Sequence, residues 1–327
     1  MGKPVMWVAS FANMSGIVGS LIAYGVSYLN GVGGLSAWRW LYLLEGIATI
    51  CFTIVVFIFL PDYPKSPRSQ KWLTPREQDY IEKRLSKNAP LTSDSAFTKE
   101  EIFAGLKDIK VWSFTLQHFL LNLSANALSW QLPTVVTSLG FAGLPRNLLL
   151  NIPPAAGSVL LVIFSGWFLK QAYMPRPLYA AILVAGALAF FTALACHIPK
   201  ASIYIACVFG TSFYSAYSIP LWAWRSSTLK GTTGTAFAIS FQNCISQVGG
   251  VIGPQLFQNR YAYNGYKTIF AICAGSLGAS LLMNLWTWWL TKDVESEVRK
   301  VRRERRYAER GHKENENKGD VTYSEKV

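Results

Sequence analysis

Acidic residues are scarce in this 327-residue sequence, which contains 18 Asp and Glu against 31 Lys and Arg. Between Ile109 and Lys292 there are none. The three histidines are far apart, and no His, Asp, Glu or Cys residues share the spacing of a metal or catalytic site. A glycine-rich phosphate loop is also missing from the sequence. These absences predict a protein that is not an enzyme and uses no metal or cofactor.

Cysteine is scarce as well, with five residues in the whole chain. All five fall in apolar segments, and their positions show neither paired nor ligand-like spacing. We therefore expect no disulfide framework and interpret these residues as small apolar side chains. They are Cys51, Cys196, Cys207, Cys244 and Cys273.

Long apolar segments are abundant. Hydrophobic residues make up 51% of the sequence and aromatic residues 14%, a composition typical of proteins that cross a membrane several times. Windows of about 20 apolar residues, the length of a membrane-spanning helix, occur eight times. The sequence therefore predicts an all-α, polytopic bundle in the lipid bilayer with eight spans. The windows lie near 7–29, 38–60, 111–138, 147–169, 177–198, 202–224, 233–258 and 266–290.

The net charge of +13 is concentrated in two hydrophilic segments. Residues 61–110 hold ten Lys and Arg, and residues 292–327 hold eleven. The six predicted spans between them place both segments on one side of the membrane, which the positive-inside rule makes cytoplasmic. We therefore expect a cytoplasmic C-terminus, a plasma-membrane location and no nucleic-acid partner. The basic run at 299–306 is explained by the same rule or by contact with anionic lipid.

The cytoplasmic loop is expected to contain two short helices. Thr74 and Glu77, like Thr98 and Glu101, have the spacing of a capping box, in which the two side chains satisfy free amides at a helix start. The basic tail has no comparable signal, and we expect it to be frayed.

Spans and loops divide the chain into four parts. Two spans, a long loop and six spans are what remains of a six-plus-six arrangement when its first four helices are absent. The two N-terminal spans are therefore expected to attach loosely to a complete six-helix bundle. The parts are 1–60 (two spans), 61–110 (loop), 111–291 (six-helix bundle) and 292–327 (basic tail).

Several short motifs follow this order of spans. Motifs in the first part of the chain resemble the sixth span and central loop of major facilitator superfamily transporters. They are WRW at 38–40, LEG, LPDYP and WLTPRE at 72–77. Three later motifs resemble the seventh, eighth and eleventh spans of that family. They are LPT at 132–134, NIPP at 151–154 and GGVIGP at 249–254. The closer resemblance is to its fungal anion:cation symporter branch, which includes allantoate, nicotinate, pantothenate and biotin permeases.

The resemblance implies secondary transport of a small organic anion by alternating access, with the proton as coupling ion. It also implies that the first four spans of the family are missing from this chain. The loop after the eighth span, GWFLKQ at 166–171, lacks the Asp-Arg pair that relatives tend to carry there. A truncated, non-transporting remnant or a nutrient sensor of the same family is the alternative.

Polar residues at helical spacing mark the helix faces that avoid lipid. In the seventh span such residues recur at intervals of 3, 4, 4 and 3 from Thr115 to Ser129. The tenth and eleventh spans carry similar faces, whereas the ninth is almost entirely apolar and is expected to face lipid. The alternative role for these side chains is hydrogen bonding between helices, at about 0.6 to 2 kcal/mol each. The substrate-binding candidates are His118, Asn122, Asn126, Tyr214, Tyr217, Gln242, Asn243 and Gln247.

Two residues are candidates for proton coupling. Glu45 is the only acid inside a predicted span, although an interfacial position near Arg39 is the simpler explanation. His118 has an ordinary pKa near neutrality, although a packing histidine would look the same. Arg225, near the cytoplasmic end of the tenth span, is interpreted as flanking charge, with contact to an anion as the alternative. Gly249, Gly250 and Gly253 are expected to be sites of close helix packing.

Overall fold

The computed structural model describes residues 2–60, 69, 73–84, 99–139, 146–196, 199–229, 232–256 and 266–324. Within these ranges the regular structure is helical and contains no strand, so the predicted all-α fold is confirmed. Long helices occur at all eight predicted spans. They are α1 (Gly2–Ser27), α2 (Ala37–Phe59), α5 (Ile109–Leu139), α6 (Ile152–Lys170), α7 (Arg176–Ala195), α8 (Lys200–Thr228), α9 (Thr232–Gln255) and α10 (Lys267–Ser324).

Four shorter helices connect the long ones. The 3₁₀ turn η1 (Val32–Gly34) joins α1 to α2, and η3 (Arg146–Asn151) precedes α6. The other two, α3 (Pro75–Arg84) and α4 (Lys99–Lys107), lie in the loop between α2 and α5.

The long helices differ in polarity according to their place in the bundle. Among the described residues, segments of α1, α2, α6, α7 and α10 are long and apolar enough to cross a membrane. The remaining three, α5, α8 and α9, are 31, 29 and 24 residues long, which suffices to cross a hydrocarbon layer of about 30 Å. Their hydropathy is lower because they carry the polar residues from which the sequence predicts inward-facing surfaces. Polarity is therefore highest in the helices that line the interior.

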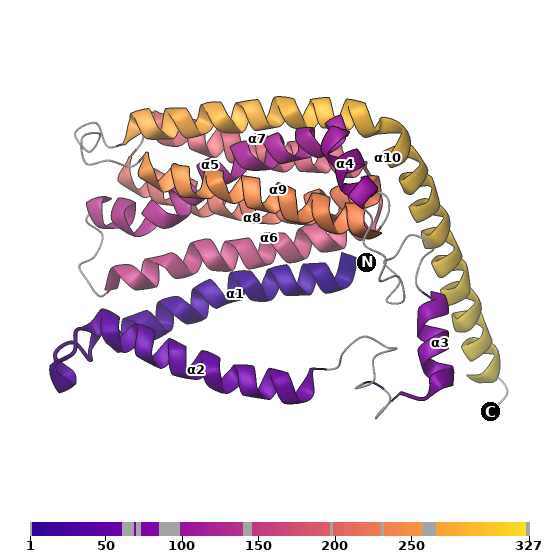
Figure 1. Ribbon diagram of the computed structural model, residues 1–327, viewed down its shortest axis with the longest axis horizontal. Helices are drawn as coiled ribbons and strands as arrows, with labels where there is room; N and C mark the ends of the chain where they lie inside the picture. The colour runs from indigo at the N-terminus through magenta and orange to yellow at the C-terminus, as the bar shows by residue number, and fades with distance from the viewer. Residues whose placement is uncertain are drawn as a thin grey trace.

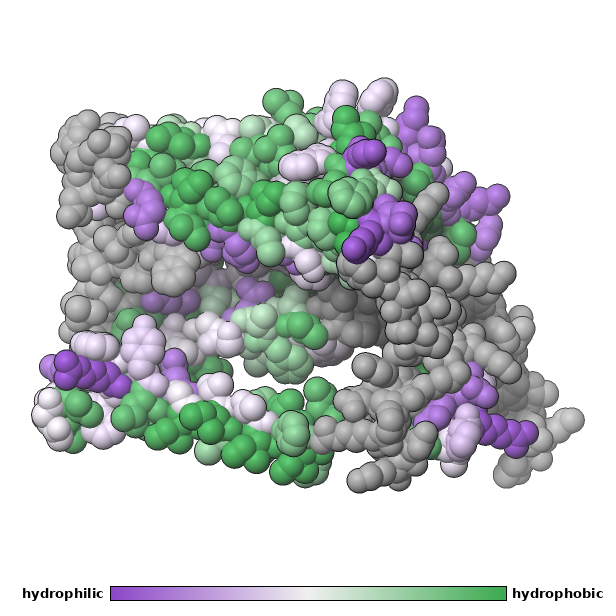
Figure 2. Space-filling view, viewed as in Figure 1, coloured by the Kyte–Doolittle hydropathy of each residue, from purple (hydrophilic) through white to green (hydrophobic). Residues whose placement is uncertain are grey.

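The helices lie side by side in a bundle (Figure 1). The most extensive contacts join α5 to α9 and α10, α7 to α8 and α10, and α6 to α8. Helix α1 packs against α6, whereas α2 packs mainly against α1 and has no buried residue. The surface of α2 is accordingly hydrophobic (Figure 2). Of the two N-terminal helices, α1 is thus the one that joins the bundle.

Helix α7 differs from its prediction. It was expected to face lipid because it is nearly all apolar, yet half of its residues are buried between α8 and α10. Small residues such as Ala180, Ala187 and Gly186 allow neighbouring helices to approach closely. An apolar surface packs as well against another helix as against lipid tails, so composition did not distinguish the two.

Glycines bring the backbones of α5 and α9 together. A Cβ atom on Gly249 would lie 2.6 Å from the carbonyl oxygen of Phe119. A Cβ atom on Gly253 would overlap the carbonyl oxygen of Leu123. The predicted close packing is therefore confirmed at these two glycines. A side chain at either position would force the two helices apart.

A buried ion pair joins three helices at one end of the bundle. Arg176 and Glu295 are each 4% exposed. The Nε atom of Arg176 donates to both carboxylate oxygens of Glu295, at 3.1 and 3.0 Å, and its Nη2 donates to Ser227 Oγ of α8 at 2.9 Å. We call this end, where Lys170 and Arg176 lie and α10 leaves the bundle, the basic end. The chain's N-terminus lies at the same end (Figure 1).

The tail also differs from its prediction. It was expected to be frayed, yet α10 continues as a helix to Ser324 and turns across the basic end (Figure 1). Arg299 Nη2 donates to the carbonyl oxygen of Tyr173 at 2.9 Å, and Arg302 donates to that of Leu169. These bonds attach the helix to the turn between α6 and α7. Arg302 also places a positive charge at the C-terminal end of α6, where the helix dipole favours it.

The first capping box is confirmed. Glu77 Oε2 accepts bonds from the amide and hydroxyl of Thr74, at 2.9 and 2.8 Å, and these bonds hold the pKa of Glu77 below its usual value. Thr98 of the second box lies outside the described residues. Glu101 accepts a bond from the amide of Gly234 at 2.7 Å. It therefore caps the start of α9 and connects the loop to the bundle.

The α5–α9 contact yields a stability prediction. Gly253→Ala should lower the free energy of unfolding by about 1 to 3 kcal/mol, because the methyl group collides with rigid backbone. The measurement is equilibrium unfolding of the detergent-solubilised chain. Gly275→Ala is the matched control, since nothing lies within 4 Å of its Cβ position. Equal effects of the two substitutions would contradict this account of the packing.

The buried ion pair yields a second prediction. Glu295→Gln should destabilise the fold by about 3 to 5 kcal/mol, because it leaves the Arg176 guanidinium buried without a counter-charge. Glu297→Gln, two residues further along an exposed face of α10, should change stability by less than about 0.5 kcal/mol. The same unfolding assay compares them. A small effect at Glu295 would show that Arg176 is solvated.

Candidate functional site

Asn122 lies at the centre of a polar network between α5, α8 and α9. It is 5% exposed. Its Oδ1 accepts a bond from the Tyr214 hydroxyl at 2.7 Å, and its Nδ2 donates to the carbonyl oxygen of Ser246 at 3.2 Å. Asn126, one turn further along α5, donates to the carbonyl oxygen of Asn122 at 3.1 Å. One amide therefore joins the three helices.

The network includes Gly250 of α9, where two amide side chains approach the backbone closely. The site of a Cβ on this glycine lies 3.0 Å from Asn126 Nδ2 and 3.3 Å from Gln247 Oε1. Asn126 is half-buried and Gln247 is exposed. A larger residue at this position would press against both amides, so glycine allows their close approach.

Arg225 is the most unusual residue of the bundle. Although it is three residues from the end of α8, it is only 1% exposed. Its Nη1 donates to Asn243 Oδ1 at 3.2 Å, and its guanidinium lies 4.9 Å from the centre of the Trp222 ring. Its Nη2 is buried without a hydrogen-bond partner. The interpretation of Arg225 as exposed flanking charge is therefore wrong.

Among the described residues, no carboxylate pairs with Arg225. The sequence has no acid between Ile109 and Lys292, and the one ion pair found within the described bundle, Arg176 with Glu295, engages a different arginine. His118 lies close enough to interact electrostatically with Arg225, and its Nδ1 is buried without a partner. The two side chains therefore lie near each other, and neither has an acidic partner among the described residues.

Two other predicted site residues lie in contacts between helices. Tyr217 is 1% exposed, and its hydroxyl is paired with the Nε2 of Gln117. Gln242 is fully buried, and its Nε2 donates to the carbonyl oxygen of Val111 at 3.3 Å. Both side chains thus fasten a neighbouring helix to α5.

Sequence inspection missed a polar stripe on α10. Its residues recur at intervals of 4, 4, 3 and 4, the same signal that identified the stripe on α5. Ser280 donates to the carbonyl oxygen of Gln117, and Thr291 accepts a bond from Trp224 Nε1 at 3.1 Å. The stripe therefore attaches α10 to α5 and α8. It consists of Ser276, Ser280, Asn284, Thr287 and Thr291.

Glu45 lies apart from this network. It is exposed on α2, whose principal contact is α1. The structure therefore brings together six of the predicted residues, His118, Asn122, Asn126, Tyr214, Asn243 and Gln247, and leaves Glu45 on another helix. Among the described residues, no three His, Cys, Asp or Glu side chains are grouped as metal ligands.

The arrangement of helices agrees with a comparison to known protein families. The family model described as Major Facilitator Superfamily matches residues 2–254, which is more than half of the chain. The chain belongs to the Major Facilitator Superfamily. It is therefore an integral membrane protein of a transporter family and not an enzyme, as the sequence predicts.

Curated relatives in this superfamily carry transporter names. The fungal "MFS transporter prlL" (Fungal sp., strain NRRL 50135) is 27% identical over 84% of this chain and 55% of its own length. The "MFS-type transporter cnsO" of Penicillium expansum is 29% identical over 85% of this chain and 55% of its own. A relative from Agrobacterium vitis, whose name proposes tartrate as its substrate, is 25% identical over 75% and 53%. The chain thus spans about half the length of these relatives.

The bond between Asn122 and Tyr214 can be measured by a double-mutant cycle. Asn122→Ala and Tyr214→Phe should each destabilise the bundle, with a coupling free energy of about 0.6 to 2 kcal/mol. Tyr204→Phe serves as the control, because the Tyr204 hydroxyl bonds to the carbonyl oxygen of Leu150 elsewhere. It should be additive with Asn122→Ala. Additivity in both pairs would contradict the network.

Proposed function

We propose that this protein acts in secondary transport of a small organic anion, by proton symport with alternating access. The observation that carries the proposal is the buried guanidinium of Arg225, which has a free Nη2 and no acid to neutralise it. We propose that the carboxylate of the substrate is the group that neutralises this guanidinium.

The energetic cost of burying the charge of Arg225 supports this proposal. A buried charge is costly unless it is paired and hydrogen-bonded. An incoming carboxylate would supply the missing counter-charge and could accept two parallel bonds from a guanidinium. An aspartate or glutamate nearby would compete with the substrate for Arg225, and the bundle contains none from Ile109 to Lys292. A site with this electrostatics selects anions over cations.

The remaining polar residues supply contacts for the rest of the substrate. Asn126 and Gln247 lie close together at Gly250, and in this proposal their amides bind hydroxyl or amide groups of the substrate. Figure 2 shows hydrophilic side chains in a hollow between the upper helices and those below them. In this proposal Tyr217 and Gln242 hold the helices that form the site. The name of the Agrobacterium vitis relative, which points to a dicarboxylate, supports the anion class.

His118 is the better of the two proton-coupling candidates. Its unpaired Nδ1 is buried near Arg225, so its protonation would respond to the arrival of an anion. Glu45 lies on α2, away from that position. We further propose that the basic end faces the cytoplasm and that the membrane is the plasma membrane. The positive-inside charge distribution supports this orientation.

Binding and uptake test the proposal together. The full chain, purified and reconstituted in liposomes, is offered radiolabelled nicotinate, pantothenate, allantoate and tartrate. At least one should bind and accumulate, and Arg225→Gln should weaken its binding by about 2 to 5 kcal/mol. Lys170→Gln removes the same charge from an exposed position at the same end and should leave affinity within about twofold.

The outcomes separate the candidate functions. Binding without uptake would favour a sensor or a non-transporting remnant of a transporter. The absence of both binding and uptake would contradict the organic-anion proposal for this chain. Equal losses of substrate affinity in the Arg225 and Lys170 variants would contradict the proposed role of Arg225 in binding the anion.

Proton coupling has its own test. His118→Gln keeps a polar side chain of similar size but cannot carry a proton in this pH range. Accumulation driven by an imposed pH gradient should fall to the level seen without a gradient, whereas exchange of labelled for unlabelled substrate should persist. Glu45→Gln should retain the response to the gradient. The reverse pattern would assign coupling to Glu45.

A further inference from the structure

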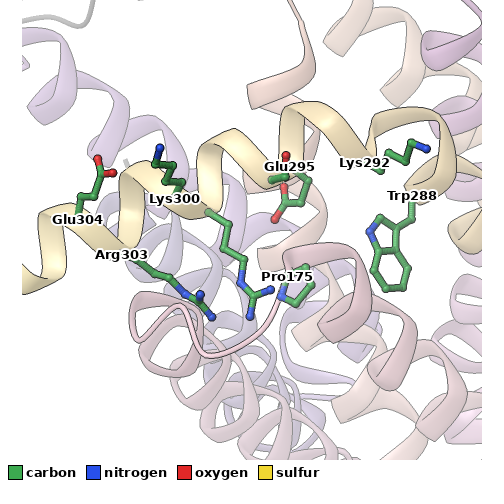
Figure 3. A pocket seen from close by; sticks show the side chains of 9 residues that line it. Pro175, Trp288, Lys292, Glu295, Lys300, Arg303 and Glu304 are labelled. Atoms are coloured by element: carbon green, nitrogen blue, oxygen red, sulfur yellow. The ribbon is translucent and has the colours of Figure 1, made fainter.

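A pocket of about 390 Å³ lies at the basic end, away from the polar network. One face of α10 and the residue before α7 form it, as Figure 3 shows. Its residues on α10 recur every three or four positions, so they form a single stripe along the helix. The lining residues are Pro175, Trp288, Lys292, Glu295, Ser296, Arg299, Lys300, Arg303 and Glu304.

The pocket is positively charged. Four of its lining residues are basic and two are acidic. The carboxylate of Glu295 is already neutralised by Arg176, which leaves Glu304 as the only other acid in the lining. Within the described part of the chain, Lys292, Lys300 and Arg303 have no acidic partner. Their positive charges are therefore available to a ligand.

One basic side chain is held in position inside the pocket. Arg299 uses its Nη2 to bond the carbonyl oxygen of Tyr173, at 2.9 Å. Its Nε is buried and has no hydrogen-bond partner. A fixed guanidinium with a free donor is suited to a phosphate oxygen. The pocket is thus more than a set of solvated surface charges.

The pocket adjoins the boundary of the membrane. Trp286 and Trp289, at the end of the apolar part of α10, are 48% and 61% exposed. Exposed tryptophans at a span end typically lie at the level of lipid headgroups. Lys292 follows Trp288 by one helical turn, a rise of about 6 Å. The basic stripe therefore begins where phosphate groups of the bilayer lie.

We propose that this pocket binds the headgroup of an anionic phospholipid. The phosphodiester contacts Arg299 and the neighbouring lysines, and Trp288 and Pro175 form the apolar wall along which the glycerol and first acyl carbons lie. Free inorganic phosphate shares the charge but not the acyl chain, and the apolar wall next to the membrane favours the lipid. This site is independent of the transported substrate.

Native mass spectrometry of the detergent-solubilised full chain tests the proposal. Phosphatidylserine and phosphatidylcholine are titrated separately, and the fraction of protein carrying a lipid is measured. Lys300→Gln with Arg303→Gln is the test variant, since both side chains are exposed and their loss should not affect folding. The matched control is Lys107→Gln with Lys170→Gln, which removes two exposed charges that do not line the pocket.

The test variant should bind phosphatidylserine roughly tenfold or more weakly, given the usual effect of basic residues at an anionic membrane surface. The control should bind it as the unmodified chain does, and phosphatidylcholine should bind weakly to all three. Equal losses in both variants would overturn the proposal in favour of unspecific charge attraction. Displacement of the lipid by equimolar inorganic phosphate would identify a free-anion site and overturn it too.

Discussion

In hydrocarbon a polar side chain has no water to bond to, and this constraint arranges the whole bundle. The amides of α5 and α9 turn inward because each finds a partner there, such as Asn122 with Tyr214 or Gln242 with Val111. Helix α2, which has no buried residue, is left at the periphery. The polar network between α5, α8 and α9 contains no carboxylate among the described residues.

Close packing makes this interior possible. Hydrogen bonds of about 3 Å between α5 and α9 require that the two backbones approach closely, and Gly249 and Gly253 allow that approach. The ion pair of Arg176 with Glu295 fixes the other side of the bundle, where α7, α8 and α10 meet. The site is therefore supported at one side by small residues and at the other by a buried charge pair.

The buried and the exposed basic residues of the bundle differ in their partners. Arg225 is buried without a counter-ion, so an anion that enters the bundle gains a favourable interaction that water cannot match. Arg176 is buried with its counter-ion and serves the architecture. Lys292, Lys300 and Arg303 of α10 lie outside the core and are exposed. The arginines of this chain are therefore found in three environments: buried without a counter-ion, buried with one, and exposed.

Much of the fold was predictable because membrane spans depend on length and hydropathy, both of which are local. Eight apolar windows became eight long helices, and the spacing of Thr74 and Glu77 identified a true capping box. The inward face of α5 was also predictable, since a polar residue facing lipid is costly wherever the helix packs. The same spacing rule would have found the stripe on α10.

Tertiary structure decided what local rules do not specify. Arg225 is near the end of its helix, where exposure is the usual outcome, and only the packing of α9 and Trp222 buries it. Glu101 was expected to cap its own helix, α4, but it caps α9, more than a hundred residues away in the sequence. The apolar α7 entered the core, because helix surfaces and lipid tails are equally good neighbours for apolar side chains. Sequence alone therefore determined which segments cross the membrane, whereas the choice of partner for each face depended on contacts between helices far apart in the chain.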